Sequence, residues 1–160
     1  MRELICFTLV LLGGLPLRSQ TPPAAWKVVK EASTACQITV PPEWVPLGEN
    51  GAAVFHDAST AIAVVTSQPG QEFKPLSATL LKVLGIPKDK LFENSATRIF
   101  YQDKTSRNPD DTSAFSSSVP AKKGTCSCHV LTLPAIAEDI AKKIALSVSP
   151  VGTNGQNDGT

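Results

Sequence analysis

A short alternating strand that runs directly into two prolines and a tryptophan, residues Cys36–Trp44, constrains the fold more than any other stretch of the chain. Cys36, Ile38 and Val40 share one face of this strand, because successive side chains point to opposite faces. The two prolines that follow lack the N–H group needed for further pairing, so the strand is predicted to end at Val40. Trp44 comes just past that end, where its ring is expected to cover the end of a core. Its predicted role is structural, and stacking on a ligand is the alternative.

Further alternating or apolar runs predict three antiparallel hairpins and one separate strand. The predicted hairpins pair 26–30 with 36–40, 52–57 with 61–68, and 112–119 with 125–131. The separate strand lies within residues 95–103. Because Ala61–Val65 is apolar on both faces, it is predicted to be the central strand of the sheet.

Two segments have helical spacing. The first is predicted to begin after Ser77 as N-cap and to stop at Gly85, with apolar residues on one stripe. The second begins near Pro134, and its stripe is predicted to contain Ile136, Ile140 and Ile144. Acidic residues in its early turns and lysines in its later turns match the helix dipole.

The order of elements along the chain is strands, helix, strands and helix. This order predicts an α+β fold, an antiparallel sheet of about six or seven strands with helices packed on its faces. The layout resembles the PsbP-like fold in three features. These are the strand that ends in Val40-Pro41-Pro42-Glu43-Trp44, the two hairpins before the first helix, and the connection from the last strand to the last helix through Leu133-Pro134. This α/β/α sandwich is shared by the extrinsic photosystem II subunit and a family of Ran-binding import factors. The resemblance covers Trp26 to Val148, and no functional residue of either family carries over to this chain.

The amino terminus has the features of an export signal. Leu4–Leu17 is nearly all apolar, follows Arg2, and is too short and too interrupted by glycine and proline to span a bilayer comfortably. Residues 1–20 are therefore predicted to be a signal peptide, which places the mature protein outside the cell or in the periplasm. An uncleaved apolar tail or a first hydrophobic strand is the alternative, because Glu3 dilutes the positive start.

Composition limits the rest of the chain to one domain and narrows its partners. The 160 residues are 42% hydrophobic, enough for one ordinary core, which is assigned to 26–149. Residues 150–160 have almost nothing apolar to bury and are predicted to be disordered. The 15 basic residues nearly balance the 14 acidic ones, so the charge gives no support for binding to nucleic acid or an anionic membrane. No membrane-spanning helix is expected in the mature chain.

The cysteines predict a disulfide if the protein is exported. Cys126 and Cys128 are on one face of a predicted strand, and a bond between them would need distortion because adjacent same-face Cα atoms lie at the edge of disulfide geometry. Cys36 shares the inward face of its own strand. A bond from Cys36 to Cys126 or to Cys128 is therefore predicted. It leaves one thiol in the mature chain, which is expected to be buried, and a site for a partner thiol is the alternative.

The same cysteines allow a second hypothesis, a thiol-dependent metal-binding or redox protein. His129 follows Cys128 directly, and thiols with an imidazole nearby can hold a soft metal. In a strand, however, His129 points away from the cysteines, and the usual C-x₂-C spacing is absent. No metal or other cofactor is predicted.

No catalytic constellation is found in the sequence. His56 and Asp57 are neighbours in a strand, so their side chains should point to opposite faces, and hydrolysis through His56 is a minor hypothesis. His56, Trp44, Arg98 and Tyr101 are the candidate residues for a ligand or partner surface. The function predicted from the sequence is an exported, non-enzymatic binding or accessory module of the cell envelope, with an unidentified protein or small ligand as its partner.

Overall fold

The computed structural model describes residues 25–33, 35–47, 53–57, 61–103, 113–132 and 138–152. The strands are β1 (Lys27–Lys30), β2 (Cys36–Val40), β3 (Val45–Leu47), β4 (Ala53–Asp57), β5 (Ala61–Pro69), β6 (Leu91–Asn94), β7 (Ile99–Asp103), β8 (Ser113–Ala121), β9 (Gly124–Thr132) and β10 (Ser149–Pro150). The helices are α1 (Ala78–Val83), a 3-10 turn at Lys88–Lys90, and α2 (Glu138–Leu146).

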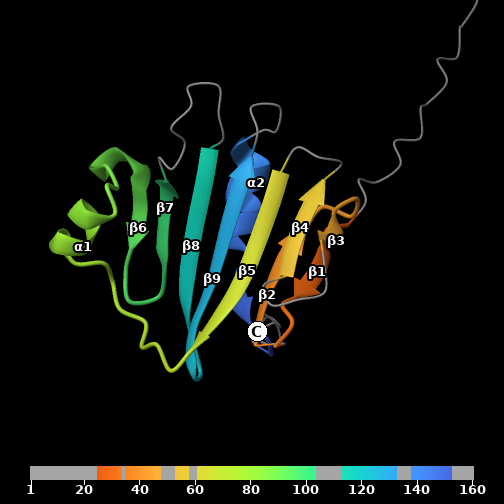
Figure 1. Ribbon diagram of the computed structural model, residues 1–160, viewed down its shortest axis with the longest axis horizontal. Helices are drawn as coiled ribbons and strands as arrows, with labels where there is room; N and C mark the ends of the chain where they lie inside the picture. Colours follow the sequence, from red (N-terminus) through yellow and green to blue (C-terminus); the bar gives the residue numbers. More distant parts are fainter. Residues whose placement is uncertain are drawn as a thin grey trace, which may run out of the picture.

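The strands form two antiparallel sheets. The larger sheet has seven strands in the order β3-β4-β5-β9-β8-β7-β6, and the smaller has the order β1-β2-β10. All three predicted hairpins are present, as β1–β2, β4–β5 and β8–β9. The predicted α+β class and the strand count of the main sheet are thus confirmed (Figure 1).

The middle of the large sheet differs from the prediction. Ala61–Val65 belongs to β5, but the central strand is β9, which pairs along its whole length with β5 on one side and β8 on the other. Apolar residues on both faces of β5 did not predict its position in the sheet, because strand order depends on pairings between distant segments. The prediction also missed β3, β6 and β10, which are too short to give a clear period-two signal.

The core lies between α2, β2 and the middle of the large sheet. Cys36, Ile38 and Val40 are fully buried, as their shared face predicted, and Trp44 packs with them. Helix α2 contacts β8, β9 and β2. This packing creates a single hydrophobic core that links the two sheets.

Helix α2 buries a different stripe from the predicted one. Its buried residues are Ala141, Ile144 and Ala145, whereas Ile140 is 36% exposed. The prediction was therefore right for Ile144 and wrong for Ile140, and Ile136 lies outside the described residues. Small alanine side chains let the helix approach the sheet closely, so the buried face followed the alanines and not only the large apolar residues.

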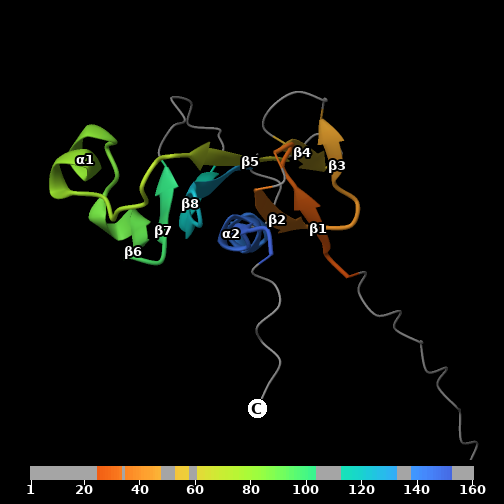
Figure 2. The same cartoon turned by 90° about the horizontal axis from the view of Figure 1, so that it is seen from below.

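Helix α1 has the predicted boundaries but lies apart from the core. The amide of Leu80 donates a 3.2 Å hydrogen bond to the side chain of Ser77, and Gly85 has a φ of 66°. The helix has no buried residue. Figure 2 shows it at the β6 end of the large sheet, whereas α2 lies under the middle of the sheet. Of the two helices, only α2 thus packs on a sheet face as predicted.

The predicted outer segments lie mostly beyond the described residues. Residues 1–20, the predicted signal peptide, are among the undescribed ones. Within the predicted tail, Pro150 still pairs with Cys36 in β10, and residues 153–160 are not described. None of the helices in the described ranges is both long and apolar enough to cross a bilayer.

Candidate ligand site at the disulfide end

A disulfide bond joins Cys36 in β2 to Cys126 in β9. The two Cα atoms are 5.6 Å apart, and 90 residues separate the cysteines in sequence. The sequence left Cys126 and Cys128 open as partners, and the structure selects Cys126. The bond fastens the small sheet to the central strand of the large sheet.

Cys128 is the one free cysteine among the described residues, and it is buried. Burial raises the pKa of its thiol to about 12, because the apolar surroundings disfavour the charged thiolate. A thiol with so little thiolate at neutral pH is a poor nucleophile and a poor metal ligand. The predicted buried leftover thiol therefore corresponds to Cys128.

A cavity of about 420 Å³, which we call the disulfide-end cavity, opens beside the disulfide. It lies where the β1–β2 turn, the end of β5, the β8–β9 turn and β10 meet, which is the lower end of the molecule in Figure 1. Its lining residues are Ser33, Ala35, Ser67, Gln68, Pro69, Ala121, Lys122, Lys123, Gly124, Thr125, Pro150 and Val151. The volume is within the range of roughly 300–1,000 Å³ that is typical of small-molecule sites.

The backbone on two sides of this cavity is fixed by hydrogen bonds. The carbonyl oxygen of Ala35 accepts from the amide of Val151 at 2.9 Å and lies 3.8 Å from the Sγ atom of Cys126. The carbonyl of Lys123 accepts from the amide of Gly70, also at 2.9 Å. The cavity is therefore formed by segments from four parts of the chain that are held together in the native fold.

Gly124 shows how closely the β8–β9 turn approaches β5. A Cβ atom at this position would lie 2.2 Å from the carbonyl oxygen of Gln68, which is far inside van der Waals contact. The φ of Gly124 is 150°, a value that other residues rarely adopt. Only glycine therefore lets the turn close against the end of β5 and complete this wall of the cavity.

A buried carboxylate lies behind the cavity wall. Glu31 is 4% exposed, and its oxygens accept hydrogen bonds from the hydroxyl and amide of Ser33 and from the amide of Ala35. Burial by itself would raise the pKa of Glu31, but the hydrogen bonds from Ser33 and Ala35 outweigh it and lower the pKa. Glu31 is therefore ionised at neutral pH, and its charge is satisfied by donors from the β1–β2 turn.

The hydroxyl of Ser33 also contacts a hydroxyl on β5. The Oγ atoms of Ser33 and Ser67 are 3.0 Å apart. Ser33 has a single hydroxyl hydrogen, which it donates to Glu31, so Ser67 must be the donor in this contact. A carboxylate, a first hydroxyl and a second hydroxyl thus form a chain that leads from the buried Glu31 to the cavity wall.

The β8–β9 turn adds two lysines. Lys122 and Lys123 are exposed, and neither takes part in an ion pair with any residue in the described ranges. By contrast, Lys74 and Lys142 pair with Glu72 and Glu138. The cavity therefore has two positive charges at its edge that no carboxylate of the described structure neutralises.

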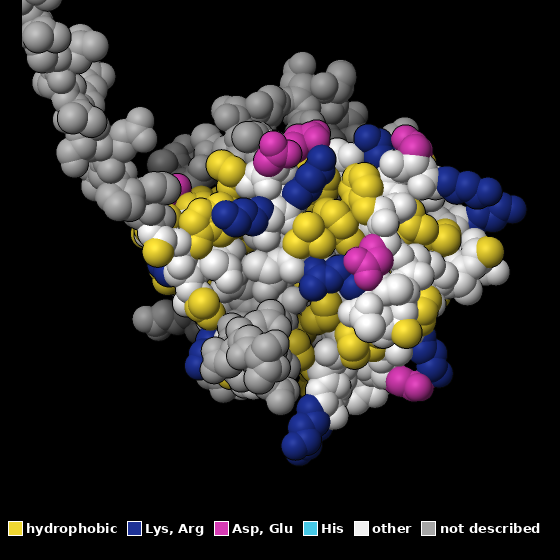
Figure 3. Space-filling view, turned by 180° about the vertical axis from the view of Figure 1, so that it is seen from behind, with side chains coloured by type: hydrophobic (Ala, Val, Ile, Leu, Met, Phe, Trp, Pro, Cys, Tyr) yellow, Lys and Arg dark blue, Asp and Glu magenta, His cyan; other side chains and the backbone are white. Residues whose placement is uncertain are grey.

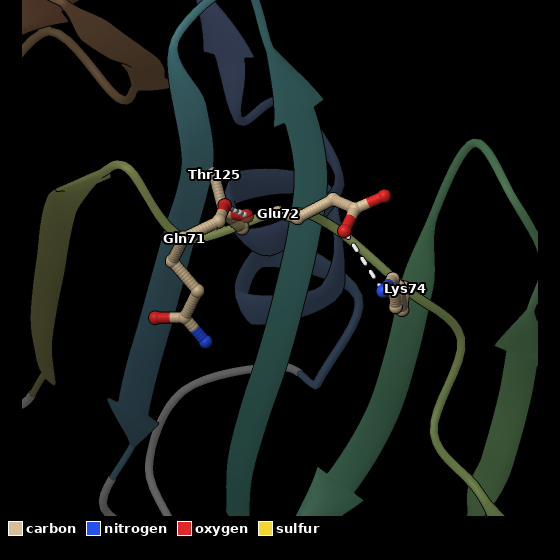
Figure 4. A network of polar contacts seen from close by, with 4 residues as sticks. All are labelled: Gln71, Glu72, Lys74 and Thr125. Carbon is tan, nitrogen blue, oxygen red and sulfur yellow. Dashed lines mark hydrogen bonds and ion pairs between the residues drawn. The ribbon is translucent and has the colours of Figure 1, made fainter.

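The hydroxyl of Thr125 is used for a structural contact. It donates a 3.0 Å hydrogen bond to the carbonyl oxygen of Gln71, just after β5 (Figure 4). The ion pair between Glu72 and Lys74, at 2.8 Å, lies farther along the same segment. Thr125 thus fastens the segment that leaves β5, and its hydrogen is unavailable to a ligand.

Of the four predicted ligand-surface residues, Trp44 and Arg98 make structural contacts. Trp44 is 1% exposed and belongs to the core. Arg98 donates from its guanidinium group to the carbonyl oxygen of Leu146 at 2.6 Å, at the end of α2, where a positive charge suits the helix dipole. Tyr101 is half-buried beside Ser116, and burial raises the pKa of its phenol. His56 pairs by backbone register with Ile62 and Val45, and its side chain lies outside the described structure.

The structure does not bring these four residues into one site, but it reveals a polar row on the sheet face away from the cysteines. Ser116 Oγ lies 2.8 Å from Nδ1 of His129, and Tyr101 pairs in register with Ser116. His129 is exposed on the face opposite Cys128, as predicted. Ser116 and Ser117 of β8 are both buried. In register, Ser116 lies between Tyr101 and His129, and Ser117 lies between Phe100 and Cys128.

The cysteines do not form a metal site in the oxidised structure. Cys36 and Cys126 are bonded to each other, so their sulfur atoms are not available as thiolate ligands. In the described part of the chain, no three His, Cys, Asp or Glu side chains are grouped as metal ligands. The thiol-dependent hypothesis therefore requires the disulfide to be reduced.

The cavity itself was not predicted from the sequence. Its residues come from turns and strand ends that are far apart in the chain, and most of them are serine, alanine, proline and lysine, which have no distinctive motif. The signal that was available is the Lys122-Lys123 pair in a hairpin turn, where lysines can also serve to discourage association between sheet edges. Figure 3, which shows the side with α2, has Lys and Arg side chains spaced among hydrophobic ones and no large region of one charge among the described residues.

Comparison with known proteins gives matches only at the level of structure. No protein-family model and no curated protein matches the sequence. A crystal structure from Bacteroides thetaiotaomicron is similar with a TM-score of 0.51 and 12% sequence identity, over 78% of this chain and 48% of the other. The chain thus spans about half the length of that structure.

A second similar structure is a PsbP protein. The solution structure of cyanobacterial PsbP (CyanoP) from Synechocystis matches with a TM-score of 0.48 and 13% identity, over 85% of this chain and 99% of the other. At such low identities, both likenesses concern the fold and carry no function across. A PsbP structure is thus among the structures similar to this chain, as the layout of the sequence suggested.

Proposed function

We propose that this chain is an exported, non-enzymatic binding or accessory module of the cell envelope that takes a small ligand in the disulfide-end cavity. The observation that carries the proposal is the cavity of about 420 Å³ next to the Cys36–Cys126 bond, with Lys122 and Lys123 at its edge, neither of which pairs with a carboxylate among the described residues. A disulfide of this kind persists in oxidising compartments, which fits export. Residues 1–20 act as the signal peptide, and 26–149 form the domain.

Ligand screening of the exported protein tests the binding role. The protein is purified after export from a host that secretes it, and its thermal unfolding is measured against a library of small metabolites. A ligand that binds the native state raises the unfolding temperature. The matched variant is Ala35→Phe, because Ala35 is exposed on the cavity wall and a phenyl group there would fill the space. Stabilisation by a ligand, lost in Ala35→Phe, is the expected result; no stabilisation by any compound contradicts the proposal.

Thiol counting and intact mass test the export role and the thiol hypothesis together. Removal of residues 1–20 removes Cys6, so the unfolded, unreduced mature protein should react at one thiol, Cys128. An unprocessed chain would react at two. Three free thiols with a stoichiometric metal in elemental analysis would instead support the metal-binding or redox hypothesis.

A further inference from the structure

We propose that the disulfide-end cavity selects small organic acids that also carry a hydroxyl or amino group on an apolar body. This inference rests on the proposed function, because it names the class of ligand for the same cavity. Three features of the lining residues lead to it: the direction of the hydroxyl hydrogens, the two lysines that have no carboxylate partner in the described ranges, and the nature of the remaining wall.

The hydroxyl chain presents acceptors to the cavity. The carboxylate of Glu31 takes the hydrogen of Ser33, and Ser33 in turn takes the hydrogen of Ser67. Both hydrogens point toward Glu31. A ligand can therefore use only the free lone pairs of the Ser33 and Ser67 hydroxyl oxygens. A ligand group that meets this wall must therefore be a donor, such as a hydroxyl or an ammonium group. The buried negative charge of Glu31 favours the same polarity.

At the β8–β9 turn, by contrast, a ligand group must accept hydrogen bonds. Lys122 and Lys123 can only donate, and no described carboxylate pairs with either. A carboxylate on the ligand would gain charge-assisted hydrogen bonds there. The third hydroxyl of the wall, that of Thr125, donates its hydrogen to Gln71 and does not alter this pattern. The cavity thus has an acceptor wall and a cationic edge.

Apart from the amide side chain of Gln68, the side chains of the remaining wall are apolar. Ala35, Pro69, Ala121, Pro150 and Val151 contribute aliphatic surface and no aromatic ring. Such a wall suits the carbon chain of a small ligand, which is released from water when it enters. The combination of acid, donor and short aliphatic chain describes hydroxy acids and amino acids of moderate size.

Four probes with nearly the same carbon chain separate these requirements. Leucine and 2-hydroxy-4-methylpentanoic acid have both an acid and a donor, 4-methylpentanoic acid lacks the donor, and 3-methylbutylamine lacks the acid. Calorimetric titration of the exported protein should give binding of the first two that is about threefold to tenfold tighter than binding of 4-methylpentanoic acid, which is the value of one net hydrogen bond. The amine should bind most weakly.

Two variants assign these preferences to residues. Ser67→Ala removes the outer acceptor and should abolish the advantage of leucine over 4-methylpentanoic acid. Lys122→Gln combined with Lys123→Gln should weaken all three acids by about fivefold and reduce the dependence of binding on salt. Lys88→Gln is the control for charge, because Lys88 is exposed near α1 and does not line the cavity; it should leave every affinity unchanged.

The outcomes separate this inference from the function on which it rests. Equal binding of the amine and the acids, or no effect of the lysine pair, would overturn the ligand class. The ligand class would also be overturned if none of the four probes binds while other library compounds bind and Ala35→Phe blocks them. In that case the proposed binding role would still stand. If no compound of any class binds, the proposed function fails as well.

Discussion

Helices α1 and α2 have similar apolar spacing, but only α2 buries its apolar side chains. Helix α2 buries Ala141, Ile144 and Ala145 against the sheets, each fully shielded from solvent. Helix α1 exposes Leu80 and Val83, with 47% and 76% of their surface in solvent. Apolar residues at helical spacing therefore predict that a helix has an apolar face. They do not predict that another part of the protein packs against that face.

The difference extends to the regions around the helices. The α2 region includes the disulfide, the central strand and the core that links both sheets. The α1 region is attached by fewer contacts, among them the pair of hydrogen bonds between the side chain of Asn94 and the backbone of Leu76, at 2.8 and 2.9 Å. Stability should accordingly be concentrated around α2, while α1 opens locally at a lower cost in free energy.

Removal of the disulfide should have the largest effect on the α2 region. Cys36→Ala combined with Cys126→Ala frees a loop closed over a separation of 90 residues. The chain-entropy model then gives a loss of about 4.6 kcal/mol in unfolding free energy, measured by urea denaturation. Cys128→Ala is the control, because it keeps the bond and removes one buried sulfur. Equal losses in the two proteins would show that the bond contributes little by closing the loop.

Truncation of one apolar side chain in each helix tests the comparison directly. Ile144→Ala opens a cavity in the core and should lower the unfolding free energy by about 3 kcal/mol. Val83→Ala removes a side chain that is mostly in solvent and should change it by less than about 0.5 kcal/mol. A large loss in Val83→Ala would mean that the α1 face is covered in solution, for example by a second copy.

Loss of the α1 cap should have a smaller and local effect. Ser77→Ala removes the acceptor for the amide of Leu80 and costs the helix about 1 kcal/mol. Because α1 has no buried residue, we expect faster hydrogen exchange of its amides with little change in global unfolding. An equal fall in global stability would contradict the idea that α1 opens by itself.

The smallest expected effect is the contribution of Glu31 to stability as a function of pH. Hydrogen bonds lower its pKa in the folded protein below the ordinary value of 4.5. The stabilisation is therefore present above pH 4.5 and is lost as the pH falls through the folded pKa. The difference in unfolding free energy between the native protein and Glu31→Gln should shrink from pH 7 to pH 3. A difference that stays constant or grows in acid would contradict this assignment.

Much of the fold could be predicted because local rules agreed with it. Two prolines ended β2 at Val40, Ser77 capped α1, and alternation separated Cys128 from His129. The cavity was not predictable in the same way. Ser33 and Ser67 are 34 positions apart, and nothing near either residue indicates that their hydroxyl groups meet.

The sequence by itself determined which side of β2 is apolar, that β2 ends at Val40 and α1 before Gly85, and that Cys36 would face the interior. The tertiary structure alone decided that Cys126 and not Cys128 is its partner, that β9 is the central strand, and which face of α2 is buried. The physical reason is that side-chain direction and chain termination depend on neighbouring residues, whereas pairing and burial depend on which distant segments pack together.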